Sequence, residues 1–319
     1  MNFIHLAAFF AVVETGSVTA ASQRLHISQP ALTREIRELE ERFGVVLFDR
    51  LPRGMQPTEA GRLLADYAAQ IFSLARNAET AVSEFAGLSR GHLALAASRT
   101  IGVYVLPPIL NEYRQLYPGI TVDAAITNTE DVEDAMLTHE RQIGLIEGPY
   151  DTATFDAALI GRDELIAVAS ATNPLARVER LTAQAIGHGE LVMREPGSGT
   201  RVVIEQAYAE RGFELEPKLS VGSPEAIKRL LTLGTAVAWI SRHIVAEELA
   251  AGTLVQLPVP DLKIERDLNL IWRKAHVLSP SARAFRTLAT QTFEQNIDFV
   301  NVDIDRSVSS ARRKKRERI

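Results

Sequence analysis

The stretch SVTAASQRLHISQPALTREIRELEERFG, residues 17–44, predicts two helices joined by a tight turn at His26-Ile27. Ser28 is suited to cap the second helix, because its hydroxyl can accept a hydrogen bond from a free backbone N–H of the first turn. Pro30 falls in that first turn, where a missing N–H is tolerated. An apolar stripe then recurs at spacings of three and four residues, typical of a helix face packed on a core: Leu32, Ile36, Leu39 and Phe43.

The opposite face of this second helix is polar. A Gln can pair bidentately with adenine, an Arg with guanine, and a Thr can touch the thymine methyl group. Side chains of these types gather at the N-terminal end, which is the end of a recognition helix that meets base edges. This face therefore predicts a DNA-reading surface made of Ser28, Gln29, Pro30, Thr33, Arg34 and Arg37.

The flanking residues complete a winged helix-turn-helix unit. An earlier helix is predicted from the stripe Phe3, Leu6, Phe9, Phe10 and Val13, with Gly16 as its C-terminal cap and Ser17 or Thr19 opening the next helix. After Gly44, an apolar run at 45–48 leads into DRLPRG, residues 49–54. This segment is typical of a small wing, and its Arg50 and Arg53 are candidate contacts to phosphate or the minor groove.

The run FFAVVETGSVTAASQRLHISQPALTREIRELEERFGVVLFDRLPRGMQPTEAG resembles the N-terminal domain of LysR-type transcriptional regulators, over residues 2 to about 62. Its most specific part is SQPALTREIRELE. The resemblance implies a DNA-binding regulator that dimerises, assembles as a dimer of dimers and responds to a small-molecule co-inducer. Two DNA-binding domains per dimer imply a partly palindromic double-stranded operator with half-sites about one helical turn apart. RNA polymerase is a further candidate partner.

The charge of the N-terminal region is unusual for a DNA-binding domain. Residues 1–60 hold six Arg, no Lys and seven acidic residues, and the whole chain carries a net charge of −5. A helical interaction domain with a solvated charged face is therefore an alternative. The placement of the charges favours DNA binding. Arg34, Arg50 and Arg53 lie at positions that would face a bound duplex, whereas the glutamates follow later in the helix.

Length and composition bound the remaining possibilities. A chain of 319 residues is expected to form two or three domains. No run approaches 18 apolar residues, no signal peptide is apparent, and no membrane partner is expected. The chain has no cysteine, so disulfides and thiolate metal sites are excluded. These features predict a cytoplasmic protein.

A long helix is predicted from Thr58, as its cap, to about Phe85. Its apolar positions follow a near-heptad stripe: Leu63, Leu64, Tyr67, Ala68, Ile71, Phe72, Ala75, Ala78, Val82 and Phe85. Such a stripe usually finds a partner helix, and in the resembling family this linker helix pairs with its copy in a homodimer. Packing on its own chain is the alternative. The segment GLSRGH, residues 87–92, is expected to be a hinge.

From His92 onward, strand-like and helix-like segments alternate. The predicted strands lie at 92–97, 120–125, 142–146, 157–160, 164–169, 191–193, 237–240 and 269–272, and the predicted helices at 103–117, 131–139, 200–212, 224–233, 244–251 and 280–295. This alternation predicts parallel-rich sheets with helices on both faces. The expected fold is therefore α/β, with an N-terminal all-α winged helix-turn-helix, a long linker helix and two Rossmann-like subdomains that resemble a periplasmic binding protein.

The predicted domain boundaries follow from these patterns. They are 1–58 for DNA binding, 59–87 for the dimerising linker helix and 88–300 for effector binding. Within the last, lobe I comprises 92–161 and 266–297, and lobe II comprises 162–265. Residues 301–319 end in ARRKKRERI and are expected to form a basic, disordered tail, which either attracts DNA weakly or has no role.

Two polar loops in the effector region are candidate ligand sites. Each follows a predicted strand and opens a helix, the position where open α/β sheets bind ligands. Ser98 and Thr100 lie in the first loop, and the second is EPGSGTR, residues 195–201, with Ser198, Gly199 and Thr200. Hydroxyls beside a helix N-terminus favour a small anion. Helix capping is the alternative for each loop.

Glu147, which follows the strand predicted to end at Ile146, is a third candidate in this cleft. Its carboxylate could accept from an amine or a hydroxyl, or repel a second negative charge. The segment GSPE, residues 222–225, could edge the cleft, but capping by Ser223 explains it equally well. The predicted effector site is therefore Ser98, Thr100, Glu147, Ser198, Gly199 and Thr200.

Catalysis finds little support in the sequence. The seven histidines are scattered without metal-ligand spacing, and no nucleophile elbow or dinucleotide glycine fingerprint is present. The pair Asp163-Glu164 is expected in a charged loop. We therefore expect no enzyme activity, cofactor or metal, and a regulator whose operator binding or promoter activation is modulated by a small anion. A solute-binding protein of the periplasmic type is the alternative.

Overall fold

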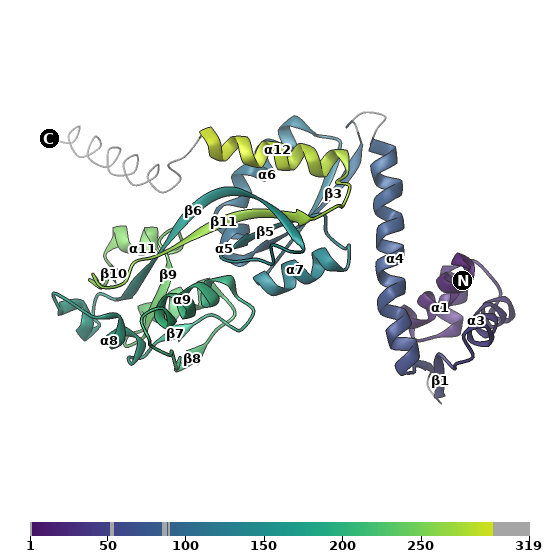
Figure 1. Cartoon of the computed structure of the whole chain (residues 1–319), viewed down its shortest axis with the longest axis horizontal. Helices are drawn as coiled ribbons and strands as arrows, with labels where there is room; N and C mark the ends of the chain where they lie inside the picture. Colours follow the sequence, from purple (N-terminus) through teal and green to yellow (C-terminus); the bar gives the residue numbers. More distant parts are fainter. Residues whose placement is uncertain (1, 52–53, 85–87, 89, 296–319) are drawn as a thin grey trace. The chain divides into compact units, whose positions relative to one another are not determined.

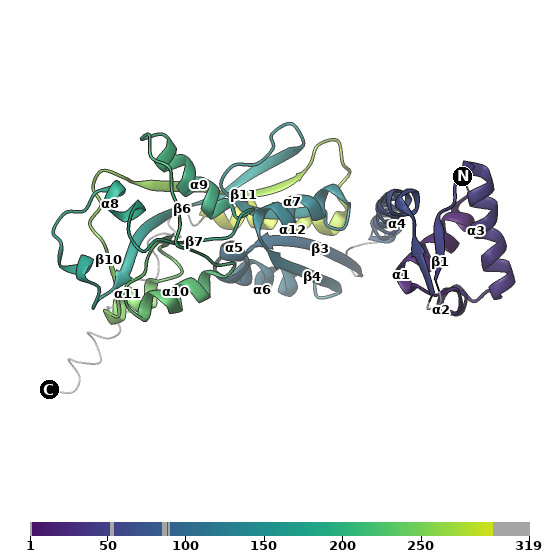
Figure 2. The ribbon, with the colours of Figure 1, turned by 90° about the horizontal axis from the view of Figure 1, so that it is seen from below.

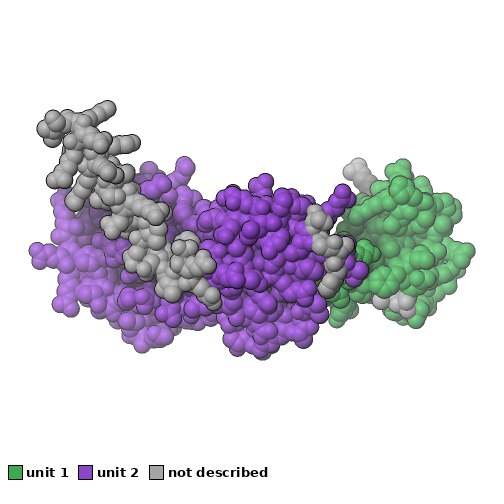
Figure 3. Space-filling model, turned by 90° about the horizontal axis from the view of Figure 1, so that it is seen from above, with its two compact units in different colours: residues 1–79, 138–140 green, residues 80–137, 141–319 purple. Residues whose placement is uncertain are grey.

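The computed structural model describes residues 2–51, 54–84, 88 and 90–295. The chain packs as two compact units, one of residues 1–79 with 138–140 and one of residues 80–137 with 141–319 (Figure 3). The basic tail at 301–319, Arg53 and Phe85 all lie outside the described residues. None of the helices in the described ranges combines the length and the apolar character needed to cross a bilayer.

Three helices form the start of the first unit (Figure 1): α1 (Phe3–Thr15), α2 (Val18–Arg24) and α3 (Gln29–Phe43). Ser17 caps α2 by accepting from Ala20 N at 3.4 Å, and Ser28 caps α3 by accepting from Ala31 N at 3.3 Å. Gly16 and Gly44 end α1 and α3 in the left-handed region, with φ of 64° and 69°. The predicted helix-turn-helix is confirmed.

The core of this unit lies between α1 and α3. Leu6 and Phe9 of α1 are buried against Leu32, Ile36 and Leu39 of α3. Two members of the predicted stripes differ: Phe43 is 45% exposed at the last position of α3, and Phe3 is 58% exposed in the first turn of α1. Both lie at helix ends, past the buried middle of their stripes.

The predicted wing is a two-stranded antiparallel hairpin of β1 (Phe48–Leu51) and β2 (Gly54–Pro57). Arg50 lies in β1, opposite Met55. Gly54 adopts φ 129° and comes so close to the chain before α2 that an added Cβ would lie 2.6 Å from Gly16 O. A glycine is therefore required for the hairpin to dock here.

The helix α4 (Glu59–Glu84) begins where the sequence predicts it, since Thr58 Oγ1 accepts from Gly61 N at 3.0 Å. Its stripe does not form a single exposed seam. Leu64, Ile71 and Phe72 pack against the core of the first unit, and the ring of Phe72 stacks on Phe10 at 5.6 Å. The exposed apolar side chains of α4 are Leu63, Tyr67, Leu74 and Val82. The expectation of one dimer seam is therefore wrong for the inward half of the stripe, because a helix beside a small domain shares its apolar surface with that domain.

The second unit begins with three parallel strands in the order β4, β3, β5: β3 (Gly91–Ser98), β4 (Ile120–Thr127) and β5 (Ile143–Glu147). The helix predicted at 103–117 is in fact two helices, α5 (Arg99–Tyr104) and α6 (Leu106–Leu116). Pro107 and Pro108 explain the break. Without an N–H, a proline is tolerated only in the first turn of a helix, so α6 has to start just before them.

Helices cover both faces of this sheet (Figure 1, Figure 2). Leu93, Leu95 and Ala97 face a core shared with α6 and α12 (Pro280–Gln295), whereas Ala96 faces a second core with α7 (Thr129–Leu137). This alternation along one strand is the period-2 pattern of a sheet buried on both sides.

Two long antiparallel strands, β6 (Phe155–Ser170) and β11 (Ile264–Arg273), run through both lobes of this unit (Figure 1). The two strands predicted at 157–160 and 164–169 are therefore one. A β-bulge between Leu268 and Asn269 accommodates the irregular register near Gly161. The prediction of parallel-rich sheets is wrong for the centre of the seven-stranded sheet, where β6 and β11 pair antiparallel with each other and with β10 (Leu254–Gln256), β5 and β9 (Val237–Ser241).

Lobe II is built on the second half of β6. Ala167 and Trp239 face a core with α9 (Gly199–Ala209), and Ile166 and Ile240 face a core with α10 (Pro224–Thr232). The other elements are a 3-10 turn (Pro174–Arg177), α8 (Ala183–Gly187), β7 (Val192–Met193), β8 (Leu219–Ser220) and α11 (Ala246–Ala251). The sequence analysis missed the short elements β8, β10 and α8.

Candidate functional site

The polar face of α3 is open to solvent. Gln29, Pro30, Thr33, Arg34 and Arg37 are all exposed, and the buried stripe lies on the other side of the helix. The hydroxyl of Thr33 donates to Gln29 O at 2.9 Å, so this side chain lies along the helix. Ser28 is exposed as well, although its hydroxyl serves as the helix cap.

Both arginines of this face are held by glutamates one turn later. Arg34 Nε lies 2.8 Å from Glu38 Oε1, and Arg37 Nε lies 2.8 Å from Glu41 Oε1. The hydrogen bond from Arg34 lowers the pKa of Glu38, so the pair is ionised. Exposed pairs of this type contribute little to stability, and the arginines can exchange a glutamate for a base or a phosphate.

A groove of about 800 Å³ lies beside this face. It is lined by the start of α2, the face of α3 and the hairpin, with Ser17, Thr19, Thr33 and Arg37 among its polar residues. Ser17 and Thr19 are therefore additional candidate contacts, and only the tertiary structure shows that they line this groove. Arg50 lies on β1 of the same hairpin.

The effector candidates meet at the ends of two strands in the second unit. Ser98 ends β3, Glu147 ends β5, and Ser198 precedes α9. The hydroxyl of Ser98 donates to Glu147 Oε2, and the hydroxyl of Thr200 donates to Glu147 Oε1 at 3.3 Å. Neither Ser98 nor Ser198 caps its helix through its side chain, which removes the capping alternative for both hydroxyls. Ser223, in contrast, caps α10 by accepting from Ala226 N at 3.3 Å.

A buried arginine that the sequence analysis missed stands at the centre of this site. The guanidinium of Arg266 is fully buried and donates from Nη1 to Thr200 Oγ1 at 2.7 Å. The same Nη1 lies 3.4 Å from Glu147 Oε1. A buried charge needs such partners, because its desolvation is otherwise very costly.

The main partner of Arg266 is Asp163, which lies directly opposite it in the β6–β11 ladder. Nε and Nη2 of Arg266 donate to Asp163 Oδ2 at 2.9 and 2.6 Å, and Ser241 Oγ donates to Oδ1 at 2.9 Å. Asp163 was expected in a charged loop, and that expectation is wrong. The signal that could have found it is a pair of opposite charges, each inside a strand-like apolar run, in LIGRDELIAV and IERDLNLIW.

Gly199 acts through its backbone. An added Cβ would lie 2.1 Å from Glu147 O, and Gly199 N donates to Thr129 Oγ1 at 3.0 Å. Only a glycine lets α9 of lobe II approach the end of β5 this closely.

Several further contacts join the two lobes. Arg99 Nε lies 3.6 Å from Glu195 Oε1, and the hydroxyl of Tyr104 donates to Glu225. Burial alone would raise the pKa of Glu195, but the hydrogen bonds and charge of the neighbouring Arg194 outweigh it and lower that pKa. The cavity bounded by Thr100, Thr200 and Arg266 holds only about 10 Å³, about the space of one water molecule.

The polar groups left over in this cleft can all donate. Among the described residues, Thr100 Oγ1, Ser198 Oγ and Arg99 Nε are buried without a hydrogen-bond partner. The acceptor, Glu147, is already satisfied by Ser98, Thr200 and Arg266. A ligand with several acceptor atoms can satisfy all three groups at once, since the guanidinium can only donate and each hydroxyl can donate or accept.

Two family models match the chain. Residues 3–62 match the bacterial regulatory helix-turn-helix protein of the lysR family, and residues 86–294 match the LysR substrate binding domain. The first match argues against the alternative of a solute-binding protein, because proteins of that class do not carry an N-terminal helix-turn-helix domain.

Similar proteins align over most of the chain. An uncharacterized HTH-type transcriptional regulator, YeiE of Escherichia coli K12, is 33% identical over 88% of this chain and 94% of that protein. The RuBisCO operon transcriptional regulator of Allochromatium vinosum is 31% identical over 88% of this chain and 93% of its own length. The solved regulatory domain of CcmR from Synechocystis PCC6803, in complex with 2-PG, is 26% identical with a TM-score of 0.58, and covers 64% of this chain and 97% of that domain.

We expect Arg266→Met to lower the free energy of unfolding by about 3–5 kcal/mol, because Asp163 and Glu147 would remain buried without a cation. Arg162→Met is the matched control. Arg162 pairs with Asp267 at 3.3 Å on the surface of the same two strands, where a pair contributes less than about 1 kcal/mol. Urea denaturation of both variants measures the difference, and equal losses would contradict the central role of the buried arginine.

Proposed function

We propose, since the chain belongs to the LysR family of transcription regulators, that it binds operator DNA through α3 and the β1–β2 hairpin. We propose further that a small anion, bound between the lobes of the second unit, modulates that binding. In this proposal Gln29, Thr33 and Arg34 read base edges, while Arg37, Arg50 and Arg53 contact the DNA backbone or the minor groove. The protein is a regulator and catalyses no reaction.

The observation that carries the effector proposal is a set of buried polar groups without hydrogen bonds between the lobes. Thr100 Oγ1 and Ser198 Oγ have no hydrogen-bond partner among the described residues, and Arg99 Nε makes only a 3.6 Å ion pair with Glu195. Leaving a buried donor unsatisfied costs about 1–3 kcal/mol. A carboxylate or oxoanion supplies several acceptor atoms at once, and the N-terminus of the eleven-residue helix α9 favours its negative charge.

The size of the cleft suggests how binding is coupled to shape. The cavity beside Thr100, Thr200 and Arg266 holds about 10 Å³, which is too small for any effector larger than water, and we propose that the lobes separate to admit a ligand there. An anion held between Thr100 of lobe I and Ser198 of lobe II then favours one lobe arrangement over another. This differential affinity is what shifts an equilibrium between two regulatory states.

The relatives support this class of ligand. The regulatory domain of CcmR was solved in complex with 2-PG, and another relative is named for the RuBisCO operon. We therefore include 2-PG among the first effectors to test, beside inorganic phosphate and sulfate.

The exposed part of α4 supports dimer formation. Leu63, Tyr67 and Leu74 present apolar side chains to solvent on a 26-residue helix, and Phe3 and Ile4 of α1 are exposed as well. Apolar side chains at this spacing favour a second helix. We propose that a second copy of the chain covers them and that two such dimers form a tetramer, so that paired α3 helices meet a partly palindromic operator.

For the DNA interface, we expect Arg34→Ala to weaken specific operator binding about tenfold to a hundredfold, the range of a lost bidentate base contact. Arg42→Ala is the control, because Arg42 is exposed on the same helix but lies outside the predicted reading face. Fluorescence anisotropy on the DNA upstream of the gene, with a scrambled duplex for comparison, separates specific from general binding. An equal loss for both variants, or none for Arg34→Ala, would remove Arg34 from the reading face.

For the assembly, we expect Tyr67→Asp to yield a folded protein of reduced mass, since it places a charge in the proposed contact between copies. Ile71→Asp should instead destabilise the first unit, because Ile71 packs against that unit's own core. Light scattering gives the mass and thermal unfolding gives the stability. A wild-type mass for Tyr67→Asp would show that this face of α4 is not the dimer contact.

For the effector, we expect Thr100→Val combined with Ser198→Ala to reduce anion affinity at least tenfold and to leave operator binding intact. Thr232→Val, at the exposed end of α10, should change neither. Calorimetry with phosphate, sulfate and 2-PG measures the affinity, and anisotropy measures DNA binding. Undiminished affinity in the double variant would place the effector elsewhere, and no binding of any of the three probes by the wild type would argue against a small anion.

A further inference from the structure

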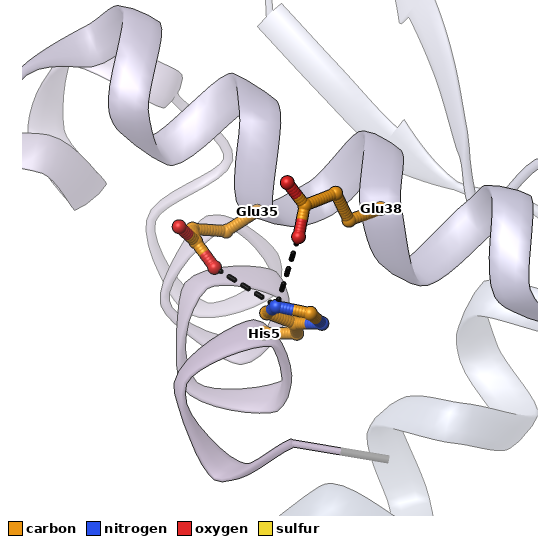
Figure 4. A group of neighbouring side chains, drawn as sticks. All are labelled: His5, Glu35 and Glu38. Carbon is orange, nitrogen blue, oxygen red and sulfur yellow. Dashed lines mark ion pairs between the residues drawn. The ribbon is translucent and has the colours of Figure 1, made fainter.

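A histidine and two glutamates meet on the side of α3 that faces α1 (Figure 4). His5 lies in the first turns of α1, and Glu35 and Glu38 lie three residues apart on α3, which places them on one face of that helix. His5 Nε2 lies 3.1 Å from Glu35 Oε2 and 3.3 Å from Glu38 Oε2. Sequence spacing does not reveal this group, because His5 is distant from the two glutamates along the chain.

The arrangement matches the first ligands of a tetrahedral metal ion. Bonds of about 2.0–2.2 Å to nitrogen and oxygen place neighbouring ligand atoms about 3.3–3.6 Å apart. The two measured distances lie close to that value, and all three candidate ligand atoms lie within 4.8 Å of one another. The His5 and Glu35 side chains are 16% and 21% exposed, so the site is partly shielded from water and still reachable.

The types of the three groups decide which cation fits. Arg34, which pairs with Glu38, and a protonated His5 can balance the two carboxylates, so the case for an ion rests on the positions of the ligand atoms. Imidazole and carboxylate ligands together suit zinc and its neighbours better than magnesium, which prefers oxygen ligands alone. The chain has no cysteine, so no thiolate competes for the ion.

We infer that His5, Glu35 and Glu38 form a binding site for a divalent transition-metal ion, with Zn²⁺ as the best match, on the back of the proposed DNA-reading helix. Each residue supplies one ligand atom, and the fourth position is left to water. His5 Nδ1 is buried without a hydrogen-bond partner among the described residues. Metal-binding histidines usually donate from this atom, and loss of such a partner costs about tenfold to a hundredfold in affinity. We therefore expect micromolar rather than nanomolar binding.

The site is connected to DNA reading through Glu38. Its Oε2 faces His5, while its Oε1 holds Arg34 Nε at 2.8 Å. An ion on Oε2 withdraws negative charge from the carboxylate and weakens its hold on Arg34. Arg34 is then freer to contact a base, so the ion should strengthen operator binding. This second step depends on the proposed role of Arg34, whereas the metal site itself does not.

The test uses the untagged, EDTA-treated full-length chain titrated with ZnCl₂ by calorimetry, with MgCl₂ as a comparison. We expect one Zn²⁺ per chain at micromolar affinity and no comparable Mg²⁺ binding. His5→Gln and Glu35→Gln should each weaken Zn²⁺ binding at least tenfold, and circular dichroism checks that both are folded. Glu41→Gln is the matched control, because Glu41 lies on the same helix but pairs with Arg37. Zinc should also raise the unfolding temperature of the wild type and of Glu41→Gln only.

Absence of stoichiometric zinc binding would overturn the site. So would binding that survives both His5→Gln and Glu35→Gln, or that is lost equally in Glu41→Gln. Operator binding, measured by anisotropy with and without Zn²⁺, tests the connection to Arg34. A severalfold gain in the wild type but not in His5→Gln supports it. Zinc binding without a gain in operator affinity would overturn the connection to Arg34 and leave the metal site unaffected. If the wild type bound no operator under any condition, the result would count against the proposed function and not against the metal site.

Discussion

The guanidinium of Arg266 is the group on which the second unit depends. It stands where β6 and β11 cross from one lobe to the other, opposite Asp163 in the ladder and within reach of Glu147 and Thr200. Removing these charges from water is expensive, so the arrangement is stable only when the partners lie where this structure has them. The same hydrogen bonds that satisfy Arg266 also bring the start of α9 to the end of β5. One buried cation therefore fixes strand register and lobe position together.

The proposed binding of an anion depends on the polar groups near this cluster that have no hydrogen-bond partner. Arg266, Ser98 and Thr200 already satisfy Glu147, whereas Thr100 Oγ1, Ser198 Oγ and Arg99 Nε have no hydrogen-bond partner among the described residues. All three can donate, so an anionic ligand could accept from them together. Gly199 contributes by absence of a side chain, since any Cβ there would separate the lobes. The site combines a buried cluster that holds the lobes together with a set of polar groups that lack hydrogen bonds. A ligand that binds these groups better in one lobe arrangement than in another would shift the equilibrium between the two.

The first unit presents arginines on an exposed helix face although residues 1–60 hold seven acidic residues and only six arginines. Its arginines project from the exposed face of α3, while the glutamates that balance them lie one turn later. Such exposed pairs are readily exchanged, so the reading face can exist in a paired and a free form. General attraction to phosphate should be weak in this domain, and specific contacts should contribute more of the affinity. The glutamate that holds Arg34 also belongs to the His5 cluster, which makes the state of this face open to control.

The sequence by itself determined the helix-turn-helix, because caps, spacing and polarity of residues 17–44 are local properties that survive without knowledge of the fold. It also placed Ser98, Glu147, Ser198 and Thr200 correctly at the ends of strands or the starts of helices, since those positions follow from local alternation. Charges inside the apolar runs LIGRDELIAV and IERDLNLIW mark Asp163 and Arg266 as unusual, but the pairing of the two, like the His5 cluster, joins distant parts of the chain and is decided by the fold. Only the tertiary structure decided which half of the α4 stripe is buried, that β6 continues past Gly161, and that polar groups of the cleft lack hydrogen-bond partners. Each of these depends on which surfaces meet, and hydrophobic periodicity specifies that a face is buried but not what buries it.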